Sequence, residues 1–117
     1  MNVDHLSPQL ATCGQVTTDD IALIHATGVK TLICNRPDGE DLAQPLFETV
    51  QTTAHLAGLH TIYFPISATG PSHGDFKKIA DIVATCPKPI LAYCDTGARS
   101  KALLSSVLEG NSNSKGS

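Results

Sequence analysis

The chain has 117 residues, 41% of them hydrophobic, and a formal net charge of −3. This length suits one domain, and the mild negative charge, without a basic stripe or an aromatic cluster, argues against nucleic-acid binding. No apolar stretch is long enough to span a membrane, and residues 1–9 lack a signal-peptide pattern, so we expect a cytoplasmic protein.

Strand-like and helix-like segments alternate along the chain. Short apolar segments predict strands over Leu10–Cys13, Lys30–Cys34, His60–Phe64 and Pro89–Tyr93. Apolar residues at helical spacing predict helices over Asp19–Ala26, Gln44–Ala57, Gly74–Thr85 and Arg99–Leu108. Residues 110–117 are polar, and we expect them to form a disordered tail after a folded domain over residues 1–109.

This alternation predicts an α/β fold, a mostly parallel sheet with helices on both faces. In such sheets, ligands bind beyond the carboxyl ends of the strands. Gln15, Asn35, Arg36, Ser67 and Cys94 each follow closely on the end of a predicted strand. We therefore expect them to line one rim of the sheet.

The segment Cys94–Ser100, C-D-T-G-A-R-S, is the most informative part of that rim. A strand that ends at Cys94, turns through Gly97 and begins a helix at Arg99 places a sulfur among backbone N–H groups and beside a guanidinium. Such a setting lowers the pKa of a cysteine from about 8.5 toward roughly 4–7. Cys94 is therefore a candidate nucleophile that faces an anion; the alternative is a buried strand-end cysteine beside a surface arginine.

Arg36 and Arg99 are the only arginines, and each follows a predicted strand. A planar guanidinium matches sulfate-like or phosphate-like groups, so Arg36 is a candidate second substrate contact. Equally, Arg36 is a candidate structural residue that holds the turn Asn35–Gly39 against the Cys94 loop.

The other three cysteines, Cys13, Cys34 and Cys86, show no spacing typical of a zinc site. We read all four as reduced thiols and expect neither a metal nor a cofactor. A minor alternative makes Cys13 a resolving thiol for Cys94.

Three motifs together carry a family resemblance: Y-C-D-T-G-A-R-S at Tyr93–Ser100, N-R-P-D-G-E at Asn35–Glu40 and C-G-Q at Cys13–Gln15. With them the chain resembles the phosphatase-like domain of β-lactamase hydrolase-like proteins. The resemblance implies a fold like that of protein tyrosine phosphatases, with four or five strands flanked by helices and a Cys-to-Arg loop. It makes residues 1–109 a single catalytic domain.

The resemblance admits two chemistries. Tyrosine phosphatases place five residues between Cys and Arg, whereas only four separate Cys94 from Arg99. The shorter loop predicts a smaller ring of amides, suited to one sulfur atom held as a persulfide, as in rhodaneses. Tyrosine phosphatases also need an acid to protonate the leaving group, yet the loop Pro65–His73 contains no carboxylate before Asp75. Both features predict a rhodanese-type sulfurtransferase.

In that mechanism the Cys94 thiolate takes sulfane sulfur from thiosulfate or a persulfide donor and passes it to a thiol, either glutathione or a protein cysteine. The resemblance makes Arg99 and Ser100 catalytic, with Ser100 donating a hydrogen bond to the sulfur, and suggests a sulfide-oxidising enzyme as partner. The predicted substrate-binding residues are Arg36 and the loop residues Asp95, Thr96, Gly97 and Ala98. Asp95 is unexpected, because an inward-pointing carboxylate would repel anionic donors and raise the pKa of Cys94.

Two other functions stay open. One is a cysteine-dependent phosphatase of the tyrosine or dual-specificity type, with a phosphocysteine at Cys94. The other is a non-catalytic module that binds a partner from sulfur metabolism through the same rim.

Overall fold

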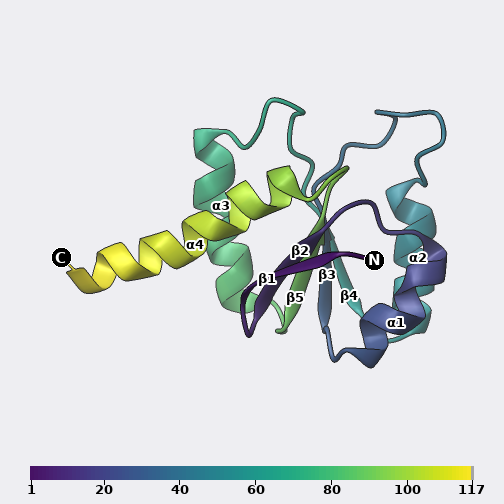
Figure 1. Ribbon diagram of the computed structural model, residues 1–117, viewed down its shortest axis with the longest axis horizontal. Helices are drawn as coiled ribbons and strands as arrows, with labels where there is room; N and C mark the ends of the chain where they lie inside the picture. Colours follow the sequence, from purple (N-terminus) through teal and green to yellow (C-terminus); the bar gives the residue numbers. More distant parts are fainter. Residues whose placement is uncertain (117) are drawn as a thin grey trace.

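Five strands form one sheet in the order β1-β2-β5-β3-β4 (Figure 1). The computed structural model describes residues 1–116, with side chains described as far as Gly110. The strands are β1 Val3–Ser7, β2 Leu10–Cys13, β3 Thr31–Cys34, β4 His60–Tyr63 and β5 Ile90–Tyr93. The helices are the 3₁₀ helix η1 Thr18–Asp20, α1 Ile21–Ala26, α2 Phe47–Leu56, α3 His73–Thr85 and α4 Ala98–Gly116.

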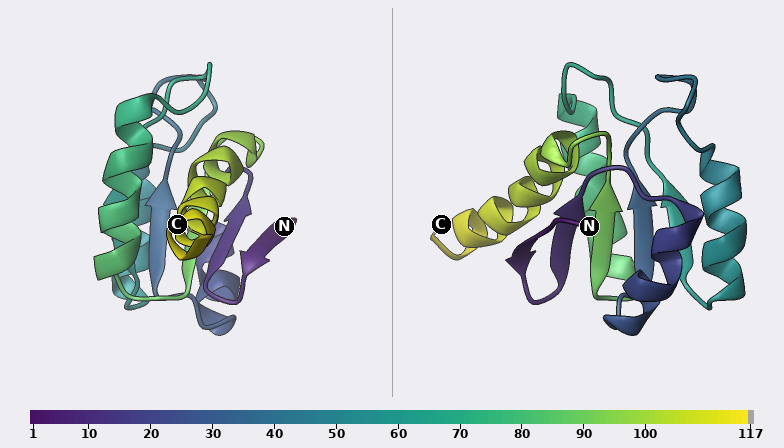
Figure 2. Two further views of the ribbon diagram at one scale, coloured as in Figure 1. Left: turned by 90° about the vertical axis from the view of Figure 1, so that its left-hand side faces the viewer. Right: turned by 45° about the vertical axis from the view of Figure 1, so that its right-hand side comes forward.

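The predicted fold class is confirmed: β2, β5, β3 and β4 are parallel, and helices cover both faces (Figures 1 and 2). The edge strand β1 was not predicted. It pairs antiparallel with β2, with a register shift between His5 and Ser7. Its sequence V-D-H-L-S mixes polar and apolar residues, and none of its side chains is fully buried, so it lacks the apolar run that marks the inner strands.

Two helix boundaries differ from the predictions by three residues or more. α2 begins at Phe47 rather than Gln44, because Leu46 is extended (φ −66°, ψ 145°) and the Asp38 carboxylate accepts the Phe47 N–H at 2.8 Å. α4 continues to Gly116, past the predicted end at Leu108. Disorder of the tail over residues 110–117 stays a prediction, since the side chains beyond Gly110 lie outside the described part.

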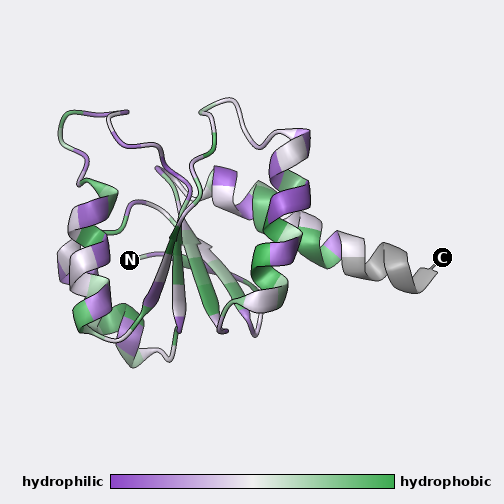
Figure 3. Ribbon diagram, turned by 180° about the vertical axis from the view of Figure 1, so that it is seen from behind, coloured by the Kyte–Doolittle hydropathy of each residue, from purple (hydrophilic) through white to green (hydrophobic). Residues whose placement is uncertain are grey.

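The core is divided between the two faces of the sheet because side chains alternate along each strand. One face joins residues of β2, β3 and β5 to α1 and α2, among them Leu32, Leu91, Ile24 and Val50. The other face packs residues such as Ile33 and Ala92 against α3 and α4. Figure 3 shows this pattern: hydrophobic residues lie on the strands and on the helix faces that meet them, while purple and near-white residues predominate in the loops above the sheet. Within residues 1–116, no helix has the combination of length and hydrophobicity that crossing a bilayer requires.

The parallel strands end at one level. Cys34 of β3 is paired in register with Tyr93 of β5, which is also paired with Cys13 of β2. The residues that follow these strand ends therefore emerge side by side at one rim, as the sequence predicted.

Candidate active site

Cys94 is the first residue after β5, and its side chain is fully buried. The Gly97 N–H donates a hydrogen bond to Cys94 Sγ at 3.1 Å. Three residues after the cysteine, the chain has thus already turned back toward the sulfur. α4 begins at Ala98, so Arg99 and Ser100 stand on its first turn.

Two glycines allow this tight turn. Gly97 has φ +97°, a conformation that side chains other than glycine rarely adopt, and a Cβ there would lie 3.3 Å from the Cys13 carbonyl carbon and oxygen. A Cβ on Gly14 would lie 3.0 Å from the Asp95 carbonyl oxygen, which accepts the Gln15 N–H at 3.2 Å. The segment after β2 and the loop after β5 are therefore packed backbone against backbone.

The surroundings of Cys94 lower the pKa of its thiol. Burial of the sulfur raises the pKa, but hydrogen bonds from the backbone and side chain of Ser100 and from the Gly97 and Arg99 amides lower it by more. The direction agrees with the prediction. The backbone N–H groups that the sequence predicted around the sulfur are among the donors that stabilise the thiolate, and the Ser100 side chain adds to them.

Ser100 is fully buried beneath the loop, where its hydroxyl donates to Asn35 Oδ1 at 2.8 Å. Asn35 in turn donates from Nδ2 to the Phe64 carbonyl at 2.9 Å. A hydroxyl has a single proton, so Ser100 serves either the Asn35 amide or the Cys94 sulfur at any moment. Asn35, which the sequence placed on the rim without a role, therefore fixes the position of the Ser100 hydroxyl and competes with the Cys94 sulfur for its proton.

Arg99 is held by an acidic residue that the sequence analysis did not assign. Its Nη1 and Nη2 atoms donate to the two Glu40 carboxylate oxygens at 2.7 and 2.9 Å, and Nη1 also donates to the Ile66 carbonyl at 3.0 Å. Glu40 is the last residue of the N-R-P-D-G-E motif. The four-position spacing from Arg36 to Glu40 suggested an ion pair between those two residues, but nothing in the sequence indicated the contact of Glu40 with Arg99.

Arg36 joins the same cluster and is almost fully buried. Its Nε donates to Glu40 Oε1 at 3.1 Å, and its Nη1 donates to Gln15 Oε1 at 3.0 Å. Both arginines of the chain thus contact one carboxylate. Hydrogen bonding to Arg99 first, and to Arg36 second, lowers the pKa of Glu40 from its usual 4.5 to about 2.

The remaining loop residues that were predicted to bind substrate face outward. Asp95, Thr96 and Ala98 are exposed. The Asp95 carboxylate lies 3.7 Å from Arg36 Nη2, and its side chain is 57% exposed. It therefore extends toward Arg36 and solvent, and the rise in the pKa of Cys94 that an inward-pointing carboxylate would cause is not seen, because that pKa is lowered. Thr96 Oγ1 accepts the Ala98 N–H at 3.3 Å.

The surface beside the loop is hollowed on the β1 side. A groove of about 390 Å³ runs between β1 and the start of α4, bordered by Thr96, Gly97 and Lys101. A second groove, of about 300 Å³, lies between Asn2 and the loop at Asp95.

The other cysteines do not form a second site. Cys13 and Cys34 are buried, and burial raises the pKa of both thiols, to about 12 for Cys13. Among the described side chains, no group of three or more His, Cys, Asp or Glu residues is placed to hold a metal ion.

Comparison with known proteins identifies the family. The sequence model of the beta-lactamase hydrolase-like protein, phosphatase-like domain matches residues 2–109. The chain belongs to this family. It is 31% identical to a beta-lactamase hydrolase-like protein of Xylella fastidiosa, over 94% of this chain and 26% of that protein. The chain thus spans about a quarter of the length of the curated relatives it matches.

Solved structures share the fold of this chain. A Neisseria meningitidis protein described as a "putative phosphatase" shares 32% identity, with a TM-score of 0.82 over 89% of this chain and 74% of that one. Pseudomonas aeruginosa TpbA, solved in complex with pTyr, shares 16% identity and a TM-score of 0.62 over 82% of this chain and 54% of that one. The second likeness shows the fold, that of the tyrosine phosphatases.

The prediction of a rhodanese-type sulfurtransferase is wrong, because the family and the neighbouring structures are phosphatases or phosphatase-like. The four-residue spacing between Cys94 and Arg99 gave the wrong function because it describes the length of the loop and not the position of the guanidinium. The position of the Arg99 guanidinium is set by Glu40 and the Ile66 carbonyl, which belong to other loops. The chain is a phosphatase-like domain with a cysteine-based site.

Proposed function

We propose that this domain is a cysteine-dependent phosphatase that hydrolyses phosphate monoesters or related phosphoryl compounds through a phosphocysteine at Cys94. The observation that carries the proposal is the contact of the buried Cys94 sulfur with the Gly97 amide at 3.1 Å, on the same loop as the fixed Arg99 guanidinium. A thiolate and a guanidinium in this arrangement suit attack on an oxyanion.

The Arg99 guanidinium supports the proposal because only one of its two hydrogen-bonding edges is occupied by Glu40. Glu40 binds the edge formed by Nη1 and Nη2. The edge formed by Nε and the second Nη2 proton is then available for two oxygens of a phosphoryl group. In this proposal Glu40 holds the guanidinium in place while the other edge receives the charge that develops on the substrate.

Ser100 and the loop supply the remaining donors. The amides of the loop and of the first turn of α4 lie at the positive end of that helix, which favours a bound anion. When Cys94 leaves the phosphoryl group in the second step, the Ser100 hydroxyl stabilises the returning thiolate. The sulfur donor and the thiol acceptor belong to the sulfurtransferase prediction, which is wrong, whereas the sulfide-oxidising partner stays a prediction.

The test is hydrolysis of 4-nitrophenyl phosphate by the wild-type domain, Cys94→Ser and Cys86→Ser. Cys86 lies at the C-terminal end of α3, so its replacement is a matched control. We expect wild type and Cys86→Ser to be active, Cys94→Ser to lose on the order of 10³ or more in kcat, and quenched wild-type reactions to contain a phosphorylated Cys94. A folded wild-type domain that neither hydrolyses the ester nor alkylates at Cys94 faster than an ordinary thiol would favour the binding module instead.

A further inference from the structure

The identity of the substrate depends on what happens to the leaving group. In the first step the Cys94 Sγ–P bond forms and the P–O bond breaks, with the electron pair going to the leaving oxygen. A phenolate such as that of tyrosine, with a conjugate-acid pKa of about 10, leaves slowly unless an acid protonates it. A carboxylate or a phosphate leaves as a stable anion without a proton.

The loop between β4 and α3 contains no acid, and all its residues lie in the described part. Its Ile66 carbonyl contacts Arg99, so this loop borders the site. Beyond Ile66 it is closed by hydroxyl and backbone contacts: Ser67 Oγ lies 3.0 Å from Thr69 Oγ1, and the Gly70 N–H donates to the Ser67 carbonyl. All side chains of the loop from Ser67 to Ser72 are neutral.

Three carboxylates at the start of α3 and in the segment after β3 have other roles. Asp75 accepts the Ser72 N–H at 2.9 Å in the capping box of α3. Asp38 accepts the Phe47 N–H at the start of α2. Glu40 is paired with both arginines, which lowers its pKa to about 2 and keeps it ionised at neutral pH. None of these three groups is free to deliver a proton.

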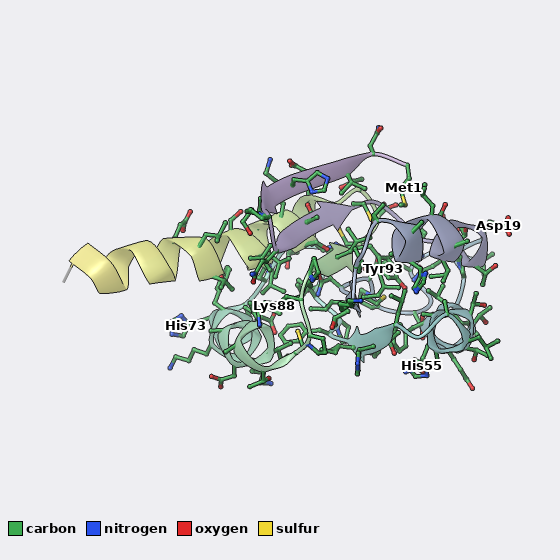
Figure 4. The ribbon with its side chains drawn as sticks, turned by 90° about the horizontal axis from the view of Figure 1, so that it is seen from below. Met1, Asp19, His55, His73, Lys88 and Tyr93 are labelled. Atoms are coloured by element: carbon green, nitrogen blue, oxygen red, sulfur yellow. The ribbon has the colours of Figure 1, made fainter. Side chains whose placement is uncertain are left out.

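Two groups remain to be considered. The His73 side chain points outward from α3, away from the sheet (Figure 4). The Asp95 carboxylate is 57% exposed and lies toward Arg36. Of these two groups, Asp95 is the one whose role in proton transfer the experiment below examines.

Building on the proposed function, we propose that the substrates carry the phosphoryl group on an acidic oxygen, as acyl phosphates and phosphoric anhydrides do. The leaving group departs as an anion, and no side chain protonates it. Water then attacks phosphorus, the S–P bond breaks with its electron pair returning to Cys94, and the water proton passes to solvent. The missing acid, which had favoured sulfur transfer in the sequence, is thus a determinant of substrate class.

The test compares 4-nitrophenyl phosphate, which has an acidic leaving group, with phenyl phosphate, whose leaving group has a conjugate-acid pKa of about 10, near that of tyrosine. Acetyl phosphate and inorganic pyrophosphate serve as probes of the two proposed sources. We expect phenyl phosphate to be at least about 100-fold slower in kcat/KM, the factor that an acid would otherwise contribute. We expect acetyl phosphate, pyrophosphate or both to form phosphocysteine at Cys94, and the faster of the two identifies the source.

Asp95→Asn decides the remaining question. If Asp95 takes no part in proton transfer, the ratio of the two aryl phosphate rates stays the same in this variant. A wider ratio in Asp95→Asn, or similar wild-type rates for both aryl phosphates, would overturn the inference but leave the proposed phosphatase intact. Failure of all four compounds to react at Cys94 would overturn the proposed function, and this inference with it.

Discussion

At the residue scale, the chemistry of the site depends on which donors surround one sulfur. Cys94 is buried, which alone would make its thiol hard to ionise, and hydrogen bonds from Ser100, Gly97 and Arg99 reverse that effect. Glu40 fixes the two positive charges of the site, because it forms ion pairs with both arginines. It does so from a loop that is distant from Arg99 in sequence. Each of these effects can be tested by one substitution.

The rate of Cys94 alkylation by iodoacetamide should show an inflection below that of a free cysteine, about 8.5. Ser100→Ala removes a side-chain donor to the thiolate, so we expect it to move the inflection upward while the domain stays folded. Measuring the rate against pH in a Cys86→Ser background avoids labelling of the half-buried cysteine. An inflection in Ser100→Ala equal to that of the wild type would contradict the assigned role of its hydroxyl.

Glu40→Gln should lower kcat/KM by about 10- to 100-fold, because the guanidinium of Arg99 loses the partner that fixes its position. Its effect on stability should depend on pH. The folded-state pKa of Glu40 lies near 2, below the usual 4.5, so the pair stabilises the fold above pH 4.5 and loses this effect as the pH falls toward 2.

Urea unfolding at several pH values measures this, with Glu48→Gln on the exposed side of α2 as control. The wild type should lose more unfolding free energy over that pH range than Glu40→Gln does. Equal losses in the two proteins would show that the Glu40 pair does not contribute to stability.

At the scale of elements, the site is a junction between the turn after β2, the loop after β5 and the start of α4. Gly14 and Gly97 are needed at this junction because the backbone of the turn after β2 packs directly against the backbone of the loop after β5. Gly97 combines a positive φ with a close approach to Cys13, whereas Gly39 has a positive φ and open space around it. Only the first position combines both constraints.

Gly97→Ala should therefore destabilise the fold by about 1–3 kcal/mol and reduce activity, since the strained loop moves away from the sulfur. Gly74→Ala is the matched control. It lies in the first turn of α3 with only Ser72 Oγ within 4 Å of the added Cβ, at 3.9 Å, so its stability should be unchanged or slightly higher. Thermal unfolding and 4-nitrophenyl phosphate hydrolysis measure both effects. Full activity in Gly97→Ala would show that the loop tolerates the side chain.

At the scale of the whole molecule, α4 links the site to the core. Its first turn carries Arg99 and Ser100, and its next turn buries Leu103 and Leu104 against the sheet face that α3 also covers. The position of the guanidinium therefore depends on packing several residues away. The same helix cannot shift to relieve strain at the loop without opening the core.

Leu104→Ala should lower the unfolding free energy by about 2–5 kcal/mol, as is typical when a fully buried leucine is truncated. Leu56→Ala, at an 86% exposed position at the end of α2, should change it by less than about 0.5 kcal/mol. Denaturant titrations compare the two variants. A small effect at Leu104 would mean that α4 is not anchored as described.

The sequence by itself determined the alternation of strands and helices, the parallel sheet and the rim that carries Cys94, because apolar runs and helical spacing are local patterns. It also identified the family from three motifs. Only the tertiary structure decided what surrounds the nucleophile. The β1 strand was missed because its stability comes from pairing with β2. Glu40 had no assigned role because its contact joins a loop to Arg99 on the first turn of α4, 59 positions away. The prediction of sulfur transfer over phosphoryl transfer was wrong for a similar reason. The length of the Cys94 loop can be read from the sequence, but the position of the Arg99 guanidinium is set by Glu40 and Ile66, which are distant in sequence.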